Sequence, residues 1–307
     1  MSASARPSPD LGGAPAVTSG VRRGQSYALV LADSVAPNGA RLTTLDVTFP
    51  MFVQPQLLRH RAFSFSVQST RAVPLETQIA RVRESAVGPS RWGAAQRGMV
   101  AAEEVSETTA RHALANWEAA AVEAANYAHR LLSLGVHQEV AGRLLAPFAT
   151  CRAIVSATEW DNFFALRISG EAQAEIRELA EAIRDAREAS VPAPLSLGQW
   201  HLPMVDAEDV AWALADSAGD ADVALRLVRL VSAGRCARVS FLQHDGRRGT
   251  PRDAKLGARL AADGHWSALE HQATPHVARL ASGNFRGWQQ FRKMHLHEDN
   301  RAAWGAK

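Results

Sequence analysis

Two early segments of the chain are rich in apolar residues, and over much of the remainder apolar residues recur at helical spacing. Residues 27–31 and 42–49 are rich in β-branched and apolar side chains, and Pro37-Asn38-Gly39 provides a turn between them. This pattern predicts a β-hairpin. Its second strand leads into a segment rich in arginine.

Helical spacing is clearest in residues 106–134, where alanine makes up much of the apolar face. Ser106 is a suitable N-cap for this helix and Gly135 a suitable stop. An alanine-rich face allows the close approach of another helix, including one from another subunit. Further helices are predicted at residues 76–84, 137–145, 173–189, 207–217 and 220–233, and residues 159–166 are expected to be apolar and buried.

The alternation of strands and helices predicts an α/β fold of the mixed α+β kind with one main domain. Neither a glycine-rich dinucleotide fingerprint nor a P-loop is present. The 307 residues, of which 47% are hydrophobic, can bury the core of such a domain. We expect residues 1–24, rich in Ser, Ala, Pro and Gly, to form a disordered tail and residues 25–307 to form the folded domain.

Charge and cysteine content narrow the function classes. The net charge of +3 suits small anionic ligands, but the chain lacks the dense Lys/Arg runs expected of a nucleic-acid-binding protein. No apolar run approaches the roughly 20 residues that span a bilayer. Cys151 and Cys236 form no CxxC pair, so a reducing cytoplasm is the expected location. The eleven histidines are scattered, and His295-x-His297 lacks partners at ligand spacing, so no metal site is predicted.

Candidate chemistry is concentrated in thirteen residues after the hairpin. This segment contains Arg59-His60-Arg61, Ser64, Ser69 and Arg71. Guanidinium groups match phosphate oxygens in geometry, and the bonds between them are strong because both partners are charged. A solvated basic segment is the alternative. Apolar neighbours such as Phe49, Phe52 and Phe63 favour a half-buried element that holds a phosphate-bearing ligand.

The spacing of these residues resembles the signature of flavin-dependent thymidylate synthases, the ThyX family. In that signature, serine and arginine follow the RHR triplet at the distances found here. Four further blocks resemble family segments in the family's order, and together they cover roughly residues 25–190: Phe49-Pro50-Met51-Phe52-Val53 with Gln56, the helix with Gly135, Glu139, Arg143 and Pro147, Asn162-Phe163-Phe164-Ala165-Leu166-Arg167, and Ala172-Gln173-Ala174-Glu175-Ile176.

One family block is out of order. Ala237-Arg238-Val239-Ser240-Phe241 and the segment from His265 to His271 resemble the family's "ARVSY…GH-x-S-P-x-EH", which normally precedes RHR. We interpret residues 191–307 as a circularly permuted part of the same domain, since chain termini usually lie at the surface and often near each other. A separate domain with a chance resemblance is the alternative.

The resemblance implies a ThyX-like fold and FAD-dependent methylation of uracil C5 in dUMP, with NADPH and 5,10-methylenetetrahydrofolate as co-substrates. It also implies a homotetramer with shared active sites. One branch of the family methylates both UMP and dUMP in peptidyl-nucleoside antibiotic biosynthesis. Two other enzymatic functions are alternatives: a strictly dUMP-specific synthase for DNA precursors, and a flavin reductase or oxidase without methyl transfer. The non-enzymatic alternative is a nucleotide-binding or scaffold protein.

The same resemblance assigns roles to individual residues. Arg167 would stabilise charge on the uracil ring, with Ser69 and Arg71 facing the nucleotide. FAD would be held by Arg59, His60, Arg61, Ser64, Asn162, Gln173 and His271, and the nucleotide by Gln56, Arg59, Ser69, Arg71, Arg143 and Arg167.

Structural roles are the alternatives for several of these residues. Arg143 could instead pair with Glu139, Asn162 and Gln173 could satisfy buried backbone, and His271 could pair with Glu270.

The chain departs from the family pattern at four positions near the expected pocket. These are Ser66 in place of asparagine, Val67 in place of an acidic residue, Ala72 in place of tyrosine, and Thr158 in place of arginine. Because unpaired polar groups are what reject wrong substrates, their loss predicts weaker discrimination between ribose and deoxyribose.

Overall fold

The computed structural model describes residues 19–240, 242, 246–295 and 298–299. The predicted hairpin is present, because β2 (Ser26–Val35) pairs antiparallel with β3 (Arg41–Pro50). Strand β1 (Val21–Arg23) pairs with β2. The predicted disordered tail was therefore too long, since the chain is already in the sheet at Val21. Residues 1–18 of that tail, Phe241 of the ARVSF block and His297 lie outside the described residues.

The sheet is completed by strands that come from later in the chain. Its order is β1-β2-β3-β5-β4, in which β5 (Thr150–Ala157) lies between β3 and β4 (Ser64–Val67) and pairs antiparallel with both. The short β6 (Ala193–Pro194) pairs parallel to β2. This arrangement confirms the predicted mixed α/β fold, with the arginine-rich segment entering the sheet through β4.

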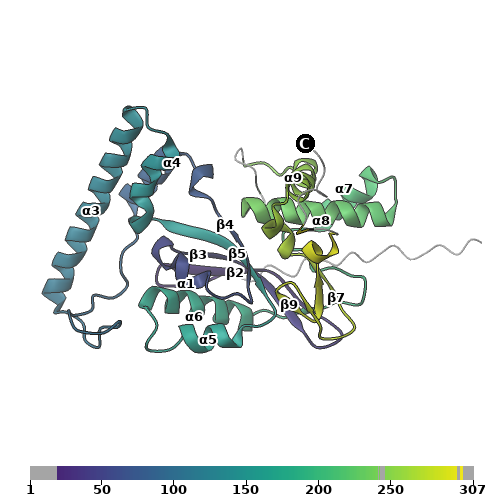
Figure 1. Ribbon diagram of the computed structural model, residues 1–307, viewed down its shortest axis with the longest axis horizontal. Coiled ribbons are helices and arrows are strands. Elements are labelled where there is room, and N and C mark those ends of the chain that lie inside the picture. Colours follow the sequence, from purple (N-terminus) through teal and green to yellow (C-terminus); the bar gives the residue numbers. More distant parts are fainter. Residues whose placement is uncertain (1–18, 241, 243–245, 296–297, 300–307) are drawn as a thin grey trace, which may run out of the picture.

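One face of the sheet is apolar and covered by helices. Strand residues such as Leu45, Val47 and Val155 are fully buried in one hydrophobic cluster with Ile176 and Ile183. The helices on this side are α1 (Gln54–Leu57), α5 (Asp161–Arg167) and α6 (Ala174–Glu188), of which α5 and α6 lie beneath the sheet in Figure 1. Packing on this face fixes the position of Arg167 at the end of α5.

The opposite face carries a stripe of buried hydroxyl groups, which comprises Ser34, Thr44, Ser156 and Ser66 from four strands. Two buried histidines from the second half of the chain bond to this hydroxyl stripe. The contacts are His201 Nδ1–Ser34 Oγ (2.9 Å), His201 Nε2–Thr44 Oγ1 (2.8 Å), Thr44 Oγ1–Ser156 Oγ (2.6 Å), His271 Nδ1–Ser156 Oγ (2.8 Å) and His271 Nε2–Ser66 Oγ (2.9 Å).

The second half of the chain packs on the side of the hydroxyl stripe. It contains α7 (Ala207–Asp216), α8 (Ala221–Arg238) and α9 (Thr250–Ala262), with short strands beneath them in Figure 1. The short strands are β7 (Ala273–Pro275), β8 (Ala281–Ser282), β9 (Phe285–Arg286) and β10 (Trp288–Gln290). Helix α8 continues past the predicted end at Ala233, so the Ala237-Arg238-Val239 block closes a helix.

A group of helices lies at the end of the sheet opposite to α7, α8 and α9 (Figure 1). The long helix α3 (Glu107–Ser133) begins as predicted, with Ser106 accepting a bond from the Thr109 amide at 3.2 Å. It packs against α2 (Leu75–Glu84), α4 (Gln138–Ala141) and the 3-10 helix η3 (Gly142–Phe148), the last two of which replace the single helix predicted at 137–145. No helix in the described part of the chain is long and apolar enough to cross a bilayer.

Candidate active site

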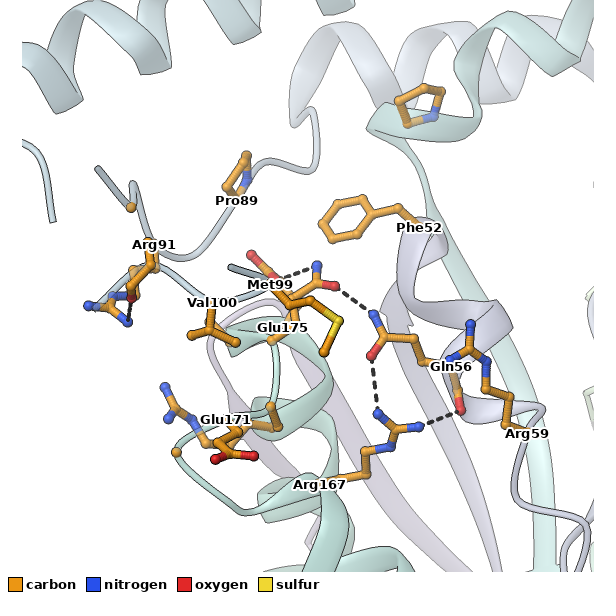
Figure 2. Close-up of a pocket in the computed structure, with 18 of the residues that line it drawn as sticks. Phe52, Gln56, Arg59, Pro89, Arg91, Met99, Val100, Arg167, Glu171 and Glu175 are labelled. Atoms are coloured by element: carbon orange, nitrogen blue, oxygen red, sulfur yellow. Dashed lines mark hydrogen bonds between the residues drawn. The ribbon is translucent and has the colours of Figure 1, made fainter. Parts of the chain in front are cut away.

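Arg167 is the centre of the polar residues predicted for the site. It ends α5 and donates three hydrogen bonds: Nε to His60 Nε2 (3.0 Å), Nη1 to Gln56 Oε1 (3.3 Å) and Nη2 to the Gln56 carbonyl oxygen (3.4 Å). Gln56 lies in α1, directly before the arginine-rich segment. Helices α1 and α5, which are far apart in sequence, thus bring Gln56, His60 and Arg167 together, as Figure 2 shows for Gln56 and Arg167.

His60 is a neutral acceptor for Arg167. The side chain is buried against the rings of Phe63 and Phe163, the latter edge-on at 4.8 Å between centroids. Burial and then the positive charge of Arg167 lower the pKa of His60 from 6.5 to about 4. At neutral pH the imidazole is therefore neutral, and because Arg167 can only donate, Nε2 is the nitrogen without a proton and accepts the bond.

Gln56 is also bonded to the N-terminal end of α6. Its Nε2 donates to Gln173 Oε1 at 2.6 Å, and Gln173 Nε2 donates to Glu175 Oε2 at 2.9 Å. Glu175 is only 3% exposed and accepts a further bond from the Ser90 amide at 2.7 Å. Gln173 therefore bonds to side chains, and not to buried backbone as the alternative interpretation had it.

These residues border a cavity of about 620 Å³. Its lining includes four guanidinium groups, from Arg59, Arg91, Arg167 and Arg177, together with the Trp117 ring. In Figure 2, Arg91 lies across the cavity from Gln56 and Arg59. Apolar lining residues are Phe52, Pro89, Met99, Val100, Pro147 and Ala172, and the carboxylates of Glu171 and Glu175 also border the cavity. The combination of cations and aromatic or apolar walls suits a ligand that carries both phosphate and a planar ring.

Around Arg59 and Arg167 the electrostatics of the cavity favour an anion. Burial and then the positive charge of Arg59 lower the pKa of Arg167. An arginine stays protonated in proteins even so, because its ordinary pKa is above about 12. A negative group near Arg59 and Arg167 would therefore relieve the repulsion between two charges that the fold holds near each other.

Ser69, Arg71 and Arg143 line a second, more open depression of about 430 Å³. Arg71 and Arg143 lie on either side of Glu139, with nitrogen–oxygen distances of 3.9 and 3.6 Å. Both arginines are well exposed, so these ion pairs contribute little to stability and leave the guanidinium groups accessible. Within one chain, the predicted phosphate-binding residues thus lie in a different depression from Arg167.

The remaining predicted residues lie outside both depressions. Arg61 and Asn162 are exposed, and their side chains form no hydrogen bond with the part of the chain that the structure describes. Ser64 is fully buried, and its hydroxyl accepts bonds from Asn284 Nδ2 (3.2 Å) and Gln290 Nε2 (3.1 Å). His271 is fully buried between Ser156 and Ser66. Within one chain, Ser64 and His271 therefore make structural contacts.

The structure corrects the interpretation of His271 in a second respect. Glu270 does not pair with it, because the Glu270 carboxylate accepts a bond from Arg292 Nη1 at 2.5 Å. The second half of the chain nevertheless reaches the arginine-rich segment. His271 bonds to β4, and Asn284 donates to the Phe63 carbonyl oxygen at 3.1 Å. Residues around His271 and Asn284 therefore contact the segment that follows Arg59-His60-Arg61.

Three cavity residues escaped the sequence analysis as functional candidates. Glu175 belongs to the Ala172–Ile176 block that resembles the family, but the resemblance assigned it no role. Arg91 follows a Gly-Pro loop, and Arg177 lies one helical turn after Gln173. Only the helical spacing between Gln173 and Arg177 could have indicated that both face the same side.

Neither cysteine is suited to act as a nucleophile. Cys151 and Cys236 are both buried, and burial raises the pKa of the first thiol to about 11 and of the second to about 12. Both therefore act as small apolar residues of the core. Among the described residues, no group of three His, Cys, Asp or Glu side chains could hold a metal ion.

The fold and the cavity define an α/β protein with a cavity suited to an anionic, ring-bearing ligand. Residues 41–193, about half of the chain, match the family model Thy1, Thymidylate synthase complementing protein. The chain belongs to this family, the flavin-dependent thymidylate synthases. The match begins in β3 and ends in β6, so it includes both depressions but not His271. No curated protein matches the chain.

The cavity residues fit the flavin nucleotide that the family uses. A flavin nucleotide requires cations for its phosphates and an apolar wall for its ring. Arg59 and Arg177 provide cations, and Phe52 and Trp117 provide aromatic surface. The volume also falls within the roughly 300–1,000 Å³ that is usual for ligand sites.

Proposed function

We propose that the protein catalyses FAD-dependent methylation of uracil C5 in a uridine monophosphate, with NADPH and 5,10-methylenetetrahydrofolate as co-substrates. The observation that supports this most is the immobilised guanidinium of Arg167 at the edge of a cationic, partly aromatic cavity. When bound, FAD would supply the reducing equivalents, so no cysteine nucleophile is needed.

Arg167 has the properties required for the uracil ring. Negative charge develops on the pyrimidine when C5 attacks the one-carbon donor, and a fixed cation stabilises that charge without reorganising. The bonds from Arg167 to Gln56 and His60 restrict its rotation. Arg59 and His60 are proposed to act on the flavin side of the cavity. Arg59 would provide a positive charge there, and His60 would act indirectly by holding Arg167.

Ser69, Arg71 and Arg143 are proposed to bind the nucleotide phosphate. Their depression is separate from the cavity of Arg167 within one chain, although Met51 and Phe52 are consecutive and line one each. A site assembled from two copies of the chain would bring the two sets of residues together. We therefore include a homotetramer with shared active sites in the proposal, and the exposed apolar residues Leu114, Val122 and Tyr127 of α3 are suitable for contact with another copy.

We further propose that residues 191–307 are a permuted part of the catalytic domain. Support comes from the bonds that His201 and His271 make to the hydroxyl stripe, because they bury polar groups from both halves of the chain. Two departures from the family pattern take part in the same contact: Ser66 bonds to His271, and Thr158 Oγ1 accepts a bond from the Arg286 amide at 3.1 Å.

The proposed substrates are both dUMP and UMP. Ser66 and Thr158 replace larger polar residues and are occupied by contacts to the second half of the chain, so they are not available to read a sugar hydroxyl. A site without such a group discriminates weakly between sugars. A role in nucleoside antibiotic biosynthesis is consistent with this relaxed selectivity and is part of the proposal.

Two measurements on the purified protein test the proposed function. The first is the absorbance spectrum with FAD, before and after addition of dUMP, which should show bound flavin and a shift on nucleotide binding. The second is methyl transfer to UMP and to dUMP under the same conditions. Product from dUMP alone would indicate a strict thymidylate synthase. NADPH oxidation without methylated product would indicate a flavin reductase or oxidase, and a protein that binds no flavin would exclude all of these.

A further inference from the structure

An unbroken line of hydrogen bonds connects the backbone of one loop to Arg167. It runs from the Ser90 amide to Glu175, then to Gln173, Gln56 and Arg167, with distances of 2.7, 2.9, 2.6 and 3.3 Å. Dashed lines in Figure 2 mark its course between Glu175 and Arg167. The last three bonds join side chains from different positions on the cavity wall, so the line fixes their mutual orientation.

The direction of this line is determined by the chemistry of its two ends. The Glu175 carboxylate can only accept, so the Gln173 amide must turn its NH₂ group toward it. Gln173 then presents Oε1 to Gln56, which must donate with its own NH₂ group. Gln56 Oε1 is left to accept from Arg167, which can only donate. Both ends thus require the same orientation of the two amides.

Glu175 is well placed to impose this orientation. It is 3% exposed, and its two oxygens accept from two different donors, Ser90 N and Gln173 Nε2. It also lies in the first turn of α6, where the helix dipole favours a negative charge. A glutamine at position 175 could not satisfy both donors in any rotamer, because its side chain has only one acceptor oxygen.

We infer that Glu175 is a positioning residue for Arg167, which rests on the proposed role of Arg167 at the uracil ring. Glu175 sets the two glutamine amides, and Gln56 then restricts Arg167 together with His60. Among the described residues, these contacts use only part of the Arg167 fork and leave the rest free for a ligand. Gln56 and Gln173 thereby act on the substrate through Arg167.

The substitution Glu175→Gln tests this directly, because it preserves shape and removes one acceptor. The new NH₂ group must face either Ser90 N or Gln173 Nε2, both of which are donors. Turning the Gln173 amide would move the mismatch to Gln56 and then to Arg167. We expect kcat for methyl transfer to fall roughly tenfold or more with little change in KM for the nucleotide, since misplacement of a group affects the transition state most. Glu188→Gln, an exposed position in the same helix, is the matched control.

A second readout is independent of catalysis. The ¹⁵N chemical shift of His60 Nε2 in the flavin-loaded protein reports its bond from Arg167, and we expect it to move in Glu175→Gln but not in Glu188→Gln. If His60 and kcat both keep their wild-type values, the inference is wrong. If the wild-type protein transfers no methyl group, the proposed function fails, but the His60 signal still decides whether Glu175 controls Arg167.

Gln173→Leu is a second variant that separates this effect from a folding defect. Gln173 is exposed, so its replacement should not disturb folding, and the leucine cannot form the bonds to Gln56 and Glu175. It should reproduce the His60 shift, and the double variant with Glu175→Gln should add little to either single effect. Additive effects of the two substitutions would contradict a single connected line. An unchanged His60 signal in Gln173→Leu would do so as well.

Discussion

Arg167 is held by three hydrogen bonds, none of which neutralises its charge. Its partners are a neutral imidazole, an amide oxygen and a backbone carbonyl oxygen. Among the residues that the structure describes, no carboxylate forms an ion pair with it. The guanidinium is therefore immobilised and still available to an anionic ligand, which is the arrangement that electrostatic catalysis requires.

Arg167→Lys keeps the charge and loses the planar fork. A lysine ammonium cannot bond to His60 and to both Gln56 oxygens in the same geometry, so the charge would no longer be fixed. We expect methyl transfer at saturating nucleotide to fall roughly a hundredfold, the usual cost of one transition-state donor. Arg184→Lys, in the Arg184–Asp185 pair at the surface of α6, should retain wild-type kcat. Comparable rates for both variants would contradict the role given to Arg167.

His201 and His271 make stability depend on pH. Burial lowers the pKa of each from 6.5 to about 3, with a raising contribution from Asp33 at His201 and a lowering one from His201 at His271. The unfolded chain therefore binds protons between pH 6.5 and about 3 that the folded chain does not. Their stabilising contribution is complete above pH 6.5 and is lost as the pH falls, at about 1.4 kcal/mol per pH unit for each proton.

Urea denaturation of His271→Asn at pH 7 and pH 5 measures this contribution. The variant should be less stable at pH 7 because it leaves a stripe hydroxyl without its partner, at a cost of about 1–3 kcal/mol. Its loss of stability between pH 7 and pH 5 should be smaller than that of the wild type. His129→Asn, at an exposed position of α3, should follow the wild-type profile. A wild-type profile in His271→Asn would show that this imidazole does not control acid stability.

Helices α8 and α9 approach each other through a reciprocal pair of glycines. A Cβ atom on Gly234 would lie 2.2 Å from the Asp253 carbonyl oxygen, and one on Gly257 would lie 2.1 Å from the Leu230 carbonyl oxygen. Each glycine thus makes room for the backbone of the opposite helix. The same close contact positions Arg235, which follows Gly234 and bonds to Asp253 Oδ2 at 2.8 Å.

Gly234→Ala should destabilise the protein even though alanine favours a helix by about 1 kcal/mol. The added methyl group meets backbone that cannot rotate away, so α8 and α9 must separate, at a net cost of roughly 1–3 kcal/mol. Gly142→Ala is the control, because its Cβ would meet only ordinary contacts at 3.6 Å in a helical conformation. Free energies of unfolding from urea titrations compare the two. Equal stabilities would mean that the helices can separate without loss.

The sequence predicted those elements whose hydrophobic pattern is unambiguous. The hairpin, α2, α3, α6 and α7 were all predicted, and in the hairpin and α3 the pattern coincides with a turn or a cap. Strand β5 was missed because Thr150–Ala157 follows a helix directly and lacks the turn residues that bound a strand. Helix α9 (Thr250–Ala262) was missed although its apolar residues recur at helical spacing and Pro251 stands in its first turn, so its sequence pattern could have predicted it.

The site was predictable in part for a similar reason. Arg59, Gln56, Arg167 and Gln173 stand in blocks that resemble the family's, and the structure brings them to one cavity. The hydroxyl stripe was not predicted, because Ser34, Thr44 and Ser156 look like solvent-facing residues until the histidines that cover them are known. Burial of Ser64 and His271 follows from contacts between the two halves of the chain, which local patterns do not reveal.

The two halves of the chain are connected by polar contacts as well as by apolar packing. The hydroxyl stripe and its two histidines lie beside the small cluster of Ile154, Met204, Cys236 and Val239. Buried polar contacts are costly unless every member is satisfied, so they favour one relative placement of the halves. This agrees with the proposal that residues 191–307 complete the same catalytic domain.

Assembly of the site from two copies can be tested by complementation. Arg71→Ala and Arg167→Ala remove residues from the two separate depressions, and each variant alone should be inactive under the proposed function. If a complete site takes Arg71 from one copy and Arg167 from another, mixed oligomers contain sites in which both residues are intact. Random mixing of equal amounts should restore about a quarter of the sites, as expected for a site shared between two subunits of a symmetric oligomer.

Whether the site is shared is decided by comparing this mixture with a second one, in which both substitutions affect the same depression. Arg71→Ala mixed with Arg143→Ala should recover no activity if the two arginines reach a site together from one copy, because every site then lacks one of them. Activity should be measured after the variants are unfolded together and refolded, so that subunits exchange. No recovery in the Arg71 and Arg167 mixture, despite exchange, would mean that each chain forms its site alone, and that the two depressions must come together by a movement within the chain.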